Sequence, residues 1–377
     1  MRLHPIDGAD AHGVQEALPA ALDGSRPLAL GFVPDAGDTV PDGTAVVIAT
    51  SGSSGIPKRV VLSADALGAS AAATAARIGQ GQWMLALPAG YVAGLQVLAR
   101  SLAAGEPPVL LDGRFTVEAF VEATSELTAE RRYTSLVPAQ LATLLDAADD
   151  LPAVRVALAA YDAILVGGQS LPSPLRGRAL DAGARIVRTY GSSETAGGCV
   201  YDDIPLDGVR VETLDGELNI AGPTLADGYL GDPELTDRTF VHADGALWYR
   251  TGDAGEVSDA GAVAVHGRID NVIVSGGINV SLDRVERVVR GIPGLEHAAV
   301  IGVADERWGE ASVVVAPRSA MPDAADGMLG RVRDAVAAAL GAPARPSRLV
   351  LLDDFPMLAS GKPDRRRMRR MLDVAGS

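Results

Sequence analysis

The sequence predicts an α/β fold, and three patterns along the chain lead to this prediction. Short β-rich apolar runs first alternate with alanine-rich helical runs, as in Ala45–Ala49, Ala64–Ile78 and Met84–Leu87. From about Leu206 the pattern changes to short strands separated by Asp-Gly turns. After Arg268 a smaller unit with both helices and strands begins. We therefore expect a large N-terminal domain of stacked sheets with flanking helices plus a β-rich subdomain, followed by a small α+β C-terminal domain.

Local signals place the remaining elements. Strands are expected at Tyr133–Val137, Ala163–Val166, Arg185–Thr189, Ala298–Val303 and Ser312–Ala316, and helices at Ala139–Leu145, from Pro172 to near Gly183, and at Arg331–Leu340. The turns are Asp207-Gly208, Asp215-Gly216, Asp227-Gly228 and Asp244-Gly245, and Ser319–Gly327 is predicted as a loop. Ser281 caps a further helix that ends at Gly291. Glycine-rich loops follow several strands, which is where α/β proteins bind ligands.

The composition indicates a globular protein without a transmembrane segment. Of 377 residues, 47% are hydrophobic and 21% charged, which is enough for two or more domains with a substantial core. No stretch reaches the roughly 18–20 apolar residues that span a bilayer, and the first residues lack a secretory signal pattern. We therefore expect a cytoplasmic protein with no stable membrane insertion. The single cysteine, Cys199, excludes an intrachain disulfide, and the five histidines show no spacing typical of a transition-metal site.

The charge balance argues against nucleic acid as a partner. The net charge is -15, whereas phosphate backbones are held by basic surfaces. Five arginines near the C-terminus run against this balance: Arg365, Arg366, Arg367, Arg369 and Arg370. They form either a solvated helix face or a binding site for a small polyanionic cofactor. A homo-oligomer is compatible with the sequence.

Only two of the 33 basic residues are lysines, Lys58 and Lys362, so a compact ammonium is retained at two positions in a chain that otherwise uses arginine. Lys58 ends the segment Thr50-Ser51-Gly52-Ser53-Ser54-Gly55-Ile56-Pro57-Lys58, which follows a predicted strand. Its glycines let backbone N–H groups converge on an anion, and its hydroxyls and lysine add hydrogen bonds and positive charge. The segment therefore predicts a phosphate site, with a flexible Ser/Gly linker as the alternative. It lacks the Gly-Lys-Ser/Thr of a Walker A loop.

This segment resembles the phosphate loop of the adenylate-forming superfamily of acyl-CoA synthetases, peptide-synthetase adenylation domains and luciferases. Further segments resemble motifs of that family in the same order: Tyr190–Thr195, Trp248–Asp253, Gly267–Asp270, Ser275–Val280 and Ser360–Arg365. Together they cover essentially the whole chain. The resemblance implies a two-step ligase that forms an acyl-adenylate from ATP and a small carboxylate, with Mg²⁺, and then transfers the acyl group to coenzyme A (CoA).

The resemblance also assigns site residues. The ATP- and AMP-binding set would be Thr50, Ser51, Gly52, Ser53, Ser54, Gly55, Lys58, Gly168, Gln169, Tyr190, Gly191, Ser192, Ser193, Asp253, Arg268 and Lys362. Lys362, Glu194, Arg268 and Lys58 would be catalytic. Lys362 would bring positive charge to an attack of one anion on another, and Glu194 would be an oxygen ligand for Mg²⁺. Asp253 would accept hydrogen bonds from the ribose. The alternatives are that Glu194 is an ordinary loop glutamate, Asp253 a turn-forming aspartate, Arg268 part of a structural ion pair and Lys362 a solvated lysine.

In this family the small domain adopts two orientations, so the resemblance implies a mobile C-terminal domain. It divides the chain into residues 1–269 and 270–377, with a hinge at Asp270. One orientation would place Lys362 in the site for adenylation. The other would withdraw Lys362 and bring in the thioester loop, Gly276 and Gly277, for CoA. The C-terminal arginines are a hypothetical contact for the CoA phosphates.

Three segments, Leu87–Leu98, Ser135–Leu141 and Ile164–Gln169, resemble the compact o-succinylbenzoate–CoA ligases of menaquinone synthesis. The acyl pocket would then be lined by Tyr91, Gly94, Gly168, Gln169, Ser192 and Gly197. The chain departs from the usual pattern with Ser54 for threonine, Arg59 for glycine and Gly90 where many relatives carry histidine. Gly90 either opens space or removes a hydrogen-bonding side chain.

Other functions share these motifs. Another aryl- or acyl-CoA ligase and a stand-alone adenylation domain that loads a carrier protein remain alternatives. A non-catalytic relative would be expected to lack Lys362 or Glu194, and both are present. The sequence leaves open which group binds the second carboxylate of o-succinylbenzoate.

Overall fold

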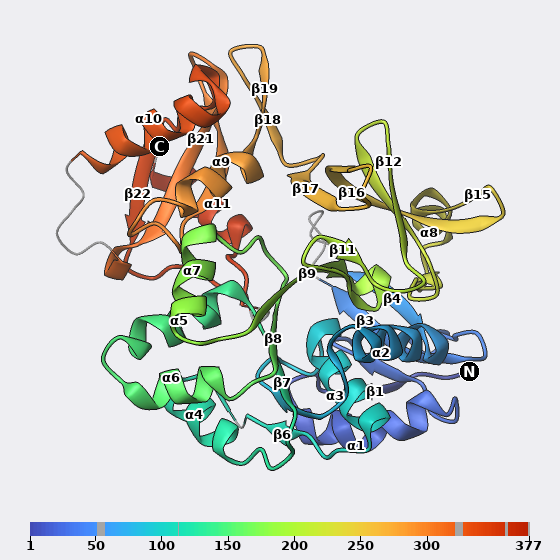
Figure 1. Ribbon diagram of the computed structural model, residues 1–377. Helices are drawn as coiled ribbons and strands as arrows, with labels where there is room; N and C mark the ends of the chain where they lie inside the picture. Colours follow the sequence, from blue (N-terminus) through green and yellow to red (C-terminus); the bar gives the residue numbers. More distant parts are fainter. Residues whose placement is uncertain (51–56, 112, 321–326, 359–360, 376–377) are drawn as a thin grey trace.

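The computed structural model describes residues 1–50, 57–111, 113–320, 327–358 and 361–375. In these ranges the chain forms four β-sheets with helices packed between and around them (Figure 1). The helices are α1 Ala11–Leu22, α2 Ala64–Ile78, α3 Val92–Ala104, α4 Val117–Ser125, α5 Pro138–Ala148, α6 Pro152–Ala159, α7 Ser173–Asp181, α8 Pro233–Thr239, α9 Leu282–Arg290, α10 Met328–Leu340 and α11 Arg365–Ala375. The predicted class, a large α/β part with a β-rich subdomain and a small α+β unit, is confirmed.

The first two sheets form the large part of the molecule. The first has the strand order β1 (His4–Ile6), β2 (Leu28–Leu30), β3 (Thr44–Thr50), β4 (Lys58–Ser63) and β14 (Gly228–Tyr229). The second has the order β11 (Ile204–Pro205), β10 (Gly197–Tyr201), β9 (Ile186–Ser192), β8 (Ala163–Val166), β7 (Arg132–Leu136), β5 (Gln82–Leu85) and β6 (Val109–Leu110). From β9 to β6 its strands are parallel. Their carboxyl ends therefore lie at one edge, where ligands bind in α/β proteins.

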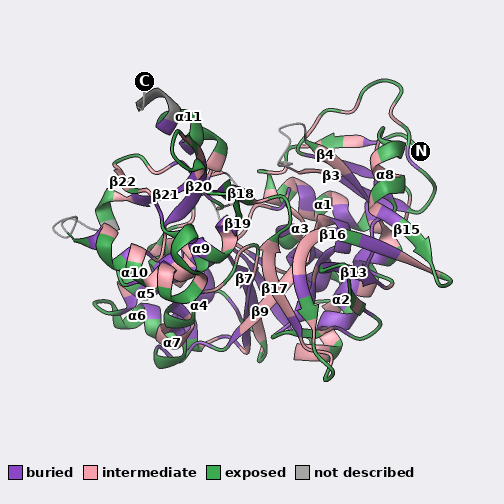
Figure 2. Cartoon of the chain, turned by 90° about the horizontal axis from the view of Figure 1, so that it is seen from above, coloured by how far each residue is buried: buried purple, intermediate pink, exposed green. Residues whose placement is uncertain are grey.

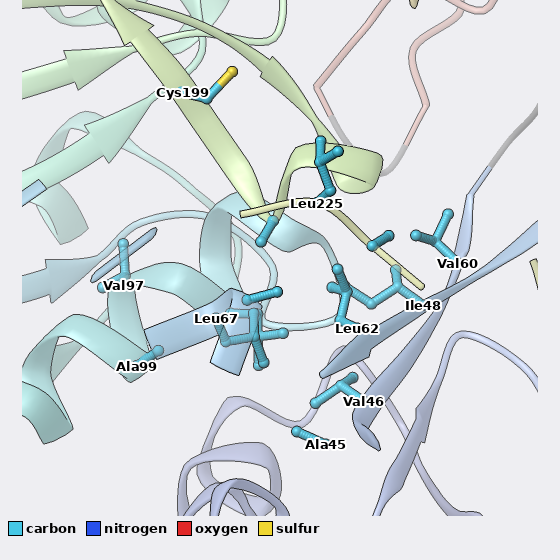
Figure 3. Close-up of a cluster of buried hydrophobic side chains, with 14 of the residues drawn as sticks. Ala45, Val46, Ile48, Val60, Leu62, Leu67, Val97, Ala99, Cys199 and Leu225 are labelled. Carbon is cyan, nitrogen blue, oxygen red and sulfur yellow. The ribbon is translucent and has the colours of Figure 1, made fainter. Parts of the chain in front are cut away.

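Helices α2 and α3 lie between these two sheets, because α2 contacts β3 and β4 as well as β10, and α3 contacts β5, β7 and β10. Figure 3 shows this core, in which Ile48 and Leu62 of the first sheet lie beside Leu67 of α2. Both strand residues are fully buried, as expected for a sheet covered by helices. Figure 2 shows buried segments in the interior and exposed ones at the periphery.

The β-rich part forms the third sheet, in the order β12 (Arg210–Leu214), β13 (Glu217–Ala221), β16 (Ala246–Val257) and β15 (Phe240–Ala243), with β17 (Val263–Arg268) also paired to β16. Asp215-Gly216 and Asp244-Gly245 join neighbouring antiparallel strands with positive φ at both residues, the signature of a type I′ turn. Asp227-Gly228 is different, because Gly228 begins β14 and pairs with β4 of the first sheet. The prediction that all four pairs separate strands of one β-rich unit was therefore wrong for this pair, and also for Asp207-Gly208, which joins β11 of the second sheet to β12 of the third.

The C-terminal unit is built on the fourth sheet, in the order β19 (Ile278–Ser281), β18 (Val272–Ser275), β21 (Gly309–Pro317) and β20 (Ala299–Asp305), with β22 (Arg348–Leu352) paired to β21. Alternate residues of β21 pack on opposite sides: Val314 belongs to the cluster with α9 and α10, and Val315 to the cluster with Met368 and Leu372 of α11. The predicted domain boundary at Asp270 lies between the last strand of the third sheet and the first strand of the fourth. The boundary and the hinge stay predictions.

Candidate active site

The predicted phosphate loop connects two strands of the first sheet. Thr50 ends β3 and Lys58 begins β4, and the two residues pair across the antiparallel ladder, with the Thr50 hydroxyl donating to the Lys58 carbonyl over 3.4 Å. Ser51, Gly52, Ser53, Ser54 and Gly55 lie outside the described residues. The loop therefore starts and ends at neighbouring strand positions, as a tight anion-binding connection requires.

Tyr229, which no sequence motif pointed to, contacts both Lys58 and Glu194. The Lys58 Nζ lies 5.2 Å from the ring centroid of Tyr229, and the Tyr229 hydroxyl donates to Glu194 Oε1 over 2.9 Å. Glu194 is buried in the 3₁₀ turn Ser193–Thr195, and Tyr229 is its only hydrogen-bond partner among the described side chains. A buried carboxylate oriented by one hydroxyl suits a hard cation that also binds phosphate oxygens. Glu194 as the Mg²⁺ ligand stays a prediction.

The side chain of Asp253 in β16 contacts Tyr190, from an earlier motif of the chain, and Arg268, from a later one. The Tyr190 hydroxyl donates to Asp253 Oδ2 over 2.6 Å, and Arg268 Nη1 lies 3.6 Å from Asp253 Oδ1. Burial raises the pKa of Asp253, although the hydrogen bond from Tyr190 and the charge of Arg268 act against this. Burial is also the main cause of the raised pKa of Tyr190, so its hydroxyl stays protonated and donates. Tyr190, Asp253 and Arg268, three predicted nucleotide-binding residues, thus lie together.

Asp253→Asn is expected to raise the KM for ATP while changing how stability depends on pH. A hydrogen bond to a charged group contributes about 1.5–3 kcal/mol, so ATP affinity should fall about 10- to 100-fold. Because the folded-state pKa of Asp253 is raised, its contribution to stability is present below the unfolded value of 3.8 and is lost as the pH rises through the folded value. Urea unfolding of the ligand-free protein at stepped pH should show this loss in the wild type and not in the variant. Parallel curves would contradict the expectation.

Lys362 of the C-terminal unit lies against the large part of the molecule. A Cβ on Gly168, in the loop after β8, would lie 3.4 Å from Lys362 Cε and 4.0 Å from Lys362 Nζ. The Lys362 side chain remains accessible to solvent, yet the surrounding protein lowers its pKa, first by desolvation and then through the charge of Arg365. Asp253 and Glu194 act in the opposite direction. The structure therefore brings Lys362, Gly168, Asp253 and Glu194 into one region.

Two of the predicted functional groups are not free to act in this arrangement: Arg268 is bound to other protein groups, and the thioester loop, Gly276 and Gly277, lies away from the large part. Arg268 binds Asp270 through Nε and Nη2, at 3.0 and 3.2 Å, and donates from Nη1 to the Thr251 carbonyl over 2.7 Å. Burial lowers its pKa, but the bonds and charges of Asp270 and Asp253 raise it overall. Gly276 and Gly277 lie in the β18–β19 hairpin, which projects away from the large part (Figure 1).

The C-terminal arginines do not form one free basic face. Arg365 is bound to Glu286 at 2.8 Å, and Arg367 to Asp354 at 3.2 Å. Arg366, Arg369 and Arg370 are exposed on α11. The CoA hypothesis therefore applies to those three residues and stays a prediction.

Four of the predicted acyl-pocket residues lie at the start of α3 (Tyr91, Gly94) and at the β9–β10 turn (Ser192, Gly197), whereas Gly168 and Gln169 lie in the loop after β8. Tyr91 is the N-cap residue of α3, and a Cβ on Gly197 would lie 3.2 Å from Gln96 Cγ. Gly90 does not open space: its N–H donates to the Gly8 carbonyl over 2.8 Å, and a Cβ there would lie 2.7 Å from the Gly8 Cα. The backbone of the N-terminal loop fills the place of the missing side chain.

Gly94→Ala is expected to destabilise the protein and not merely to narrow the pocket. An added Cβ would lie 2.2 Å from the Pro88 carbonyl oxygen, and overpacking of this kind costs about 1–3 kcal/mol. The matched control is Gly68→Ala on α2, where a Cβ meets nothing within 4 Å and alanine favours the helix. Thermal unfolding should show a lower Tm for the first variant and an equal or higher Tm for the second. Equal Tm values for Gly94→Ala and the wild type would contradict the expectation.

Arg100 is a functional candidate that the sequence reasoning missed. It lies one turn after Gln96 on the same face of α3 and is only 6% exposed. Its Nη2 donates to the Tyr201 hydroxyl over 3.3 Å, its guanidinium lies 5.1 Å from the Trp83 ring centroid, and its Nε has no partner in the described structure. Burial lowers its pKa. A cavity of about 120 Å³ borders it. The signal in the sequence was a pair of polar residues, Gln96 and Arg100, four apart in a largely apolar helix that also contains Ser101.

No carboxylate of the described residues forms a salt bridge with Arg100, and the residues of α3 from Gly94 to Ser101 are buried. Arginine is rarely buried unless it is paired. The Gln96 Oε1, one turn away, is also buried without a hydrogen-bond partner. Arg100 Nε and Gln96 Oε1 are thus two unsatisfied polar atoms one turn apart on α3. The cavity that borders Arg100 is lined by none of the predicted acyl-pocket residues.

Comparison with known proteins identifies the class. Residues 10–230 match the AMP-binding enzyme family, and residues 284–362 match the AMP-binding enzyme C-terminal domain. The chain belongs to the AMP-binding enzymes, and it is an ATP-dependent carboxylate–CoA ligase that uses Mg²⁺ and CoA. No helix of the described residues has the length and hydropathy needed to cross a bilayer.

Individual relatives are similar over almost the whole chain. A Mycobacterium tuberculosis protein named "Probable 2-succinylbenzoate--CoA ligase" is 40% identical, with 98% of this chain and 97% of the relative covered. The amide bond synthetase McbA from Marinactinospora thermotolerans is 25% identical, with a TM-score of 0.75 over 98% of this chain and 80% of that one. The o-succinylbenzoate CoA synthetase from Bacillus subtilis, solved with its acyl-adenylate intermediate, is 24% identical with a TM-score of 0.72, over 97% and 83% of the two chains. At that identity the last likeness concerns the fold alone.

Proposed function

We propose that this enzyme activates o-succinylbenzoate with ATP and transfers the succinylbenzoyl group to CoA. The observation that carries the substrate assignment is Arg100, a buried guanidinium without a carboxylate partner among the described residues. The full-length similarity to the mycobacterial relative supports the same assignment.

A dicarboxylate substrate accounts for Arg100. One carboxylate is consumed by the chemistry and needs to reach the nucleotide, whereas the other has to be bound away from it. Arg100 lies one helical turn beyond Gln96, and Gln96 contacts the position of Gly197 at the predicted pocket. A planar guanidinium pairs with a carboxylate through two parallel hydrogen bonds, and the Arg100 Nε has no hydrogen-bond partner in the described structure. A substrate carboxylate there would offset the cost of burying the arginine.

The first step joins the other substrate carboxylate to AMP. A carboxylate oxygen attacks the α-phosphorus of ATP, and pyrophosphate leaves with the bonding electron pair. Lys362, beside Gly168, supplies positive charge where negative charge develops. Glu194, oriented by Tyr229, would hold Mg²⁺, which neutralises phosphate charge when bound. Asp253, which accepts a hydrogen bond from Tyr190, would also accept hydrogen bonds from the ribose hydroxyls.

The second step transfers the acyl group to sulfur. The CoA thiolate attacks the acyl carbonyl carbon, and AMP leaves as the acyl–phosphate bond breaks. We assign the present arrangement to the first step, because Lys362 lies against Gly168 while Gly276 and Gly277 project away (Figure 1). A rotation of the C-terminal unit about Asp270 would withdraw Lys362 and bring in Gly276 and Gly277. The bidentate Arg268–Asp270 pair would have to change its geometry in that motion.

An end-point assay with ATP, Mg²⁺, CoA and o-succinylbenzoate tests the proposal, with AMP and the acyl-CoA product followed by mass. Formation of both supports it. Pyrophosphate without acyl-CoA would indicate a carrier-protein or amine acceptor. Activity only with a different aryl or acyl acid would keep the ligase chemistry and reject o-succinylbenzoate.

A further inference from the structure

Glu286 of α9 is a buried carboxylate that binds two arginines. Its side chain is 8% exposed; both oxygens accept from Arg365 Nη2 at 2.8 Å, and Oε1 forms an ion pair with Arg290 Nη2 at 3.0 Å. The backbone N–H of Val300 in β20 donates to Glu286 Oε2 over 2.9 Å. The carboxylate is therefore fully engaged, and its position is set by the core of the C-terminal unit.

The two arginines connect the Glu286 carboxylate to different parts of the molecule. Arg365 begins α11 three residues after Lys362, so its bond to Glu286 anchors one end of the segment that carries the lysine. Arg290 reaches the large part of the molecule, where its Nη1 donates to Gln169 Oε1 over 3.2 Å. Gln169 directly follows Gly168, the residue that Lys362 lies against. One carboxylate thus connects both sides of the contact between Lys362 and Gly168.

We propose that Glu286 and Arg290 are positioning residues that hold the C-terminal unit with Lys362 at Gly168 for the adenylation step. The inference rests on the function proposed above for Lys362. Arg290 is 4% exposed, and its Nε donates to the Ala298 carbonyl over 2.7 Å, so its guanidinium is held on three sides and aimed at Gln169. Apolar residues often stabilise a core as well as a buried ion pair does. The bond across to Gln169 is what an apolar residue could not supply.

Arg290→Met removes the contact with Gln169 and leaves the Glu286–Arg365 pair intact. We expect it to slow substrate-dependent ATP–pyrophosphate exchange about 10- to 100-fold, because small misplacements of a catalytic group have effects of this size. Conversion of ready-made acyl-adenylate and CoA to thioester should keep its rate. The matched control is Arg284→Met on the same helix, where the arginine is exposed. Glu286→Gln is the second variant and should slow exchange as well.

Distances between spin labels test the arrangement without any turnover. Leu180→Cys on α7 and Arg331→Cys on α10 place labels at exposed positions of the two parts, and the native Cys199 is buried. The wild type should give one narrow distance distribution, and Arg290→Met a broad one or a longer distance. An unchanged distribution, or equal slowing of both half-reactions, would overturn the inference. If Lys362→Ala kept full exchange, the proposed role of Lys362 would fail instead, and the label distances alone would then decide whether Arg290 docks the unit.

Discussion

Lys362→Ala is expected to reduce acyl-adenylate formation about 100- to 1,000-fold, the effect of removing one group that stabilises developing negative charge. Lys362 lies against Gly168 and within electrostatic reach of Asp253 and Glu194, so it faces the region where ATP would be bound. Substrate-dependent exchange of labelled pyrophosphate into ATP measures this step directly. Because the side chain is accessible to solvent, the Tm should change little.

The other half-reaction and a neighbouring arginine provide the controls. In the proposed mechanism Lys362 takes no part in thioester formation, so the variant should convert ready-made acyl-adenylate and CoA at nearly the wild-type rate. Arg366→Ala removes a nearby exposed positive charge from α11 and should leave exchange unchanged. Equal loss in both half-reactions would contradict the assigned role, and loss in Arg366→Ala would indicate a general charge effect.

Arg100→Met is expected to lower kcat/KM for o-succinylbenzoate about 150- to 5,000-fold. The substrate's second carboxylate would be buried without its partner, and breaking a buried pair in this way costs about 3–5 kcal/mol. The ligand-free protein should become no less stable, because burial lowers the pKa of Arg100 and its charge has no carboxylate partner in the described structure. Initial rates and thermal unfolding separate the two effects.

A substrate analogue sharpens this test. 4-Oxo-4-phenylbutanoate lacks the ring carboxylate and so does not need the guanidinium. The wild type should strongly prefer o-succinylbenzoate, since its buried arginine would remain unpaired with the analogue. Arg100→Met should lose or reverse this preference. An unchanged ratio between the two acids would exclude Arg100 as the carboxylate-binding group.

Local patterns were enough to predict most elements. Ala64–Ile78 and Ala163–Val166 were predicted with the observed bounds, because Ser63 caps the helix and a continuous apolar run forms the buried strand. Ser281 and Gly291 likewise flank α9 as predicted. Asp227-Gly228 was misassigned because an Asp-Gly pair marks a turn without saying to which sheet the next strand belongs. Strand pairing between Gly228 and Val61 is a contact between residues distant in sequence.

The site was predictable where a motif is contiguous and not where it depends on contacts between distant residues. Tyr229 orients Glu194 from a strand of another sheet, and Gly8 fills the place beside Gly90 from the N-terminal loop. Neither pairing has a signal within one segment. Arg100 carried only a weak signal, since a lone arginine on a helix is usually solvated, and its burial follows from the packing of α3 against Trp83 and Tyr201.

The sequence by itself determined the α/β class, the order of the motifs and the chemistry that two lysines, one glutamate and one aspartate can perform, because side-chain type and local periodicity are properties of short segments. Only the tertiary structure decided which of these groups meet. It placed Lys362 on Gly168, engaged Arg268 with Asp270, joined Arg290 to Gln169 and left Arg100 buried without a partner. The physical reason is that burial, desolvation and pairing of charges depend on how sheets and helices pack, and that packing brings together residues far apart in the chain.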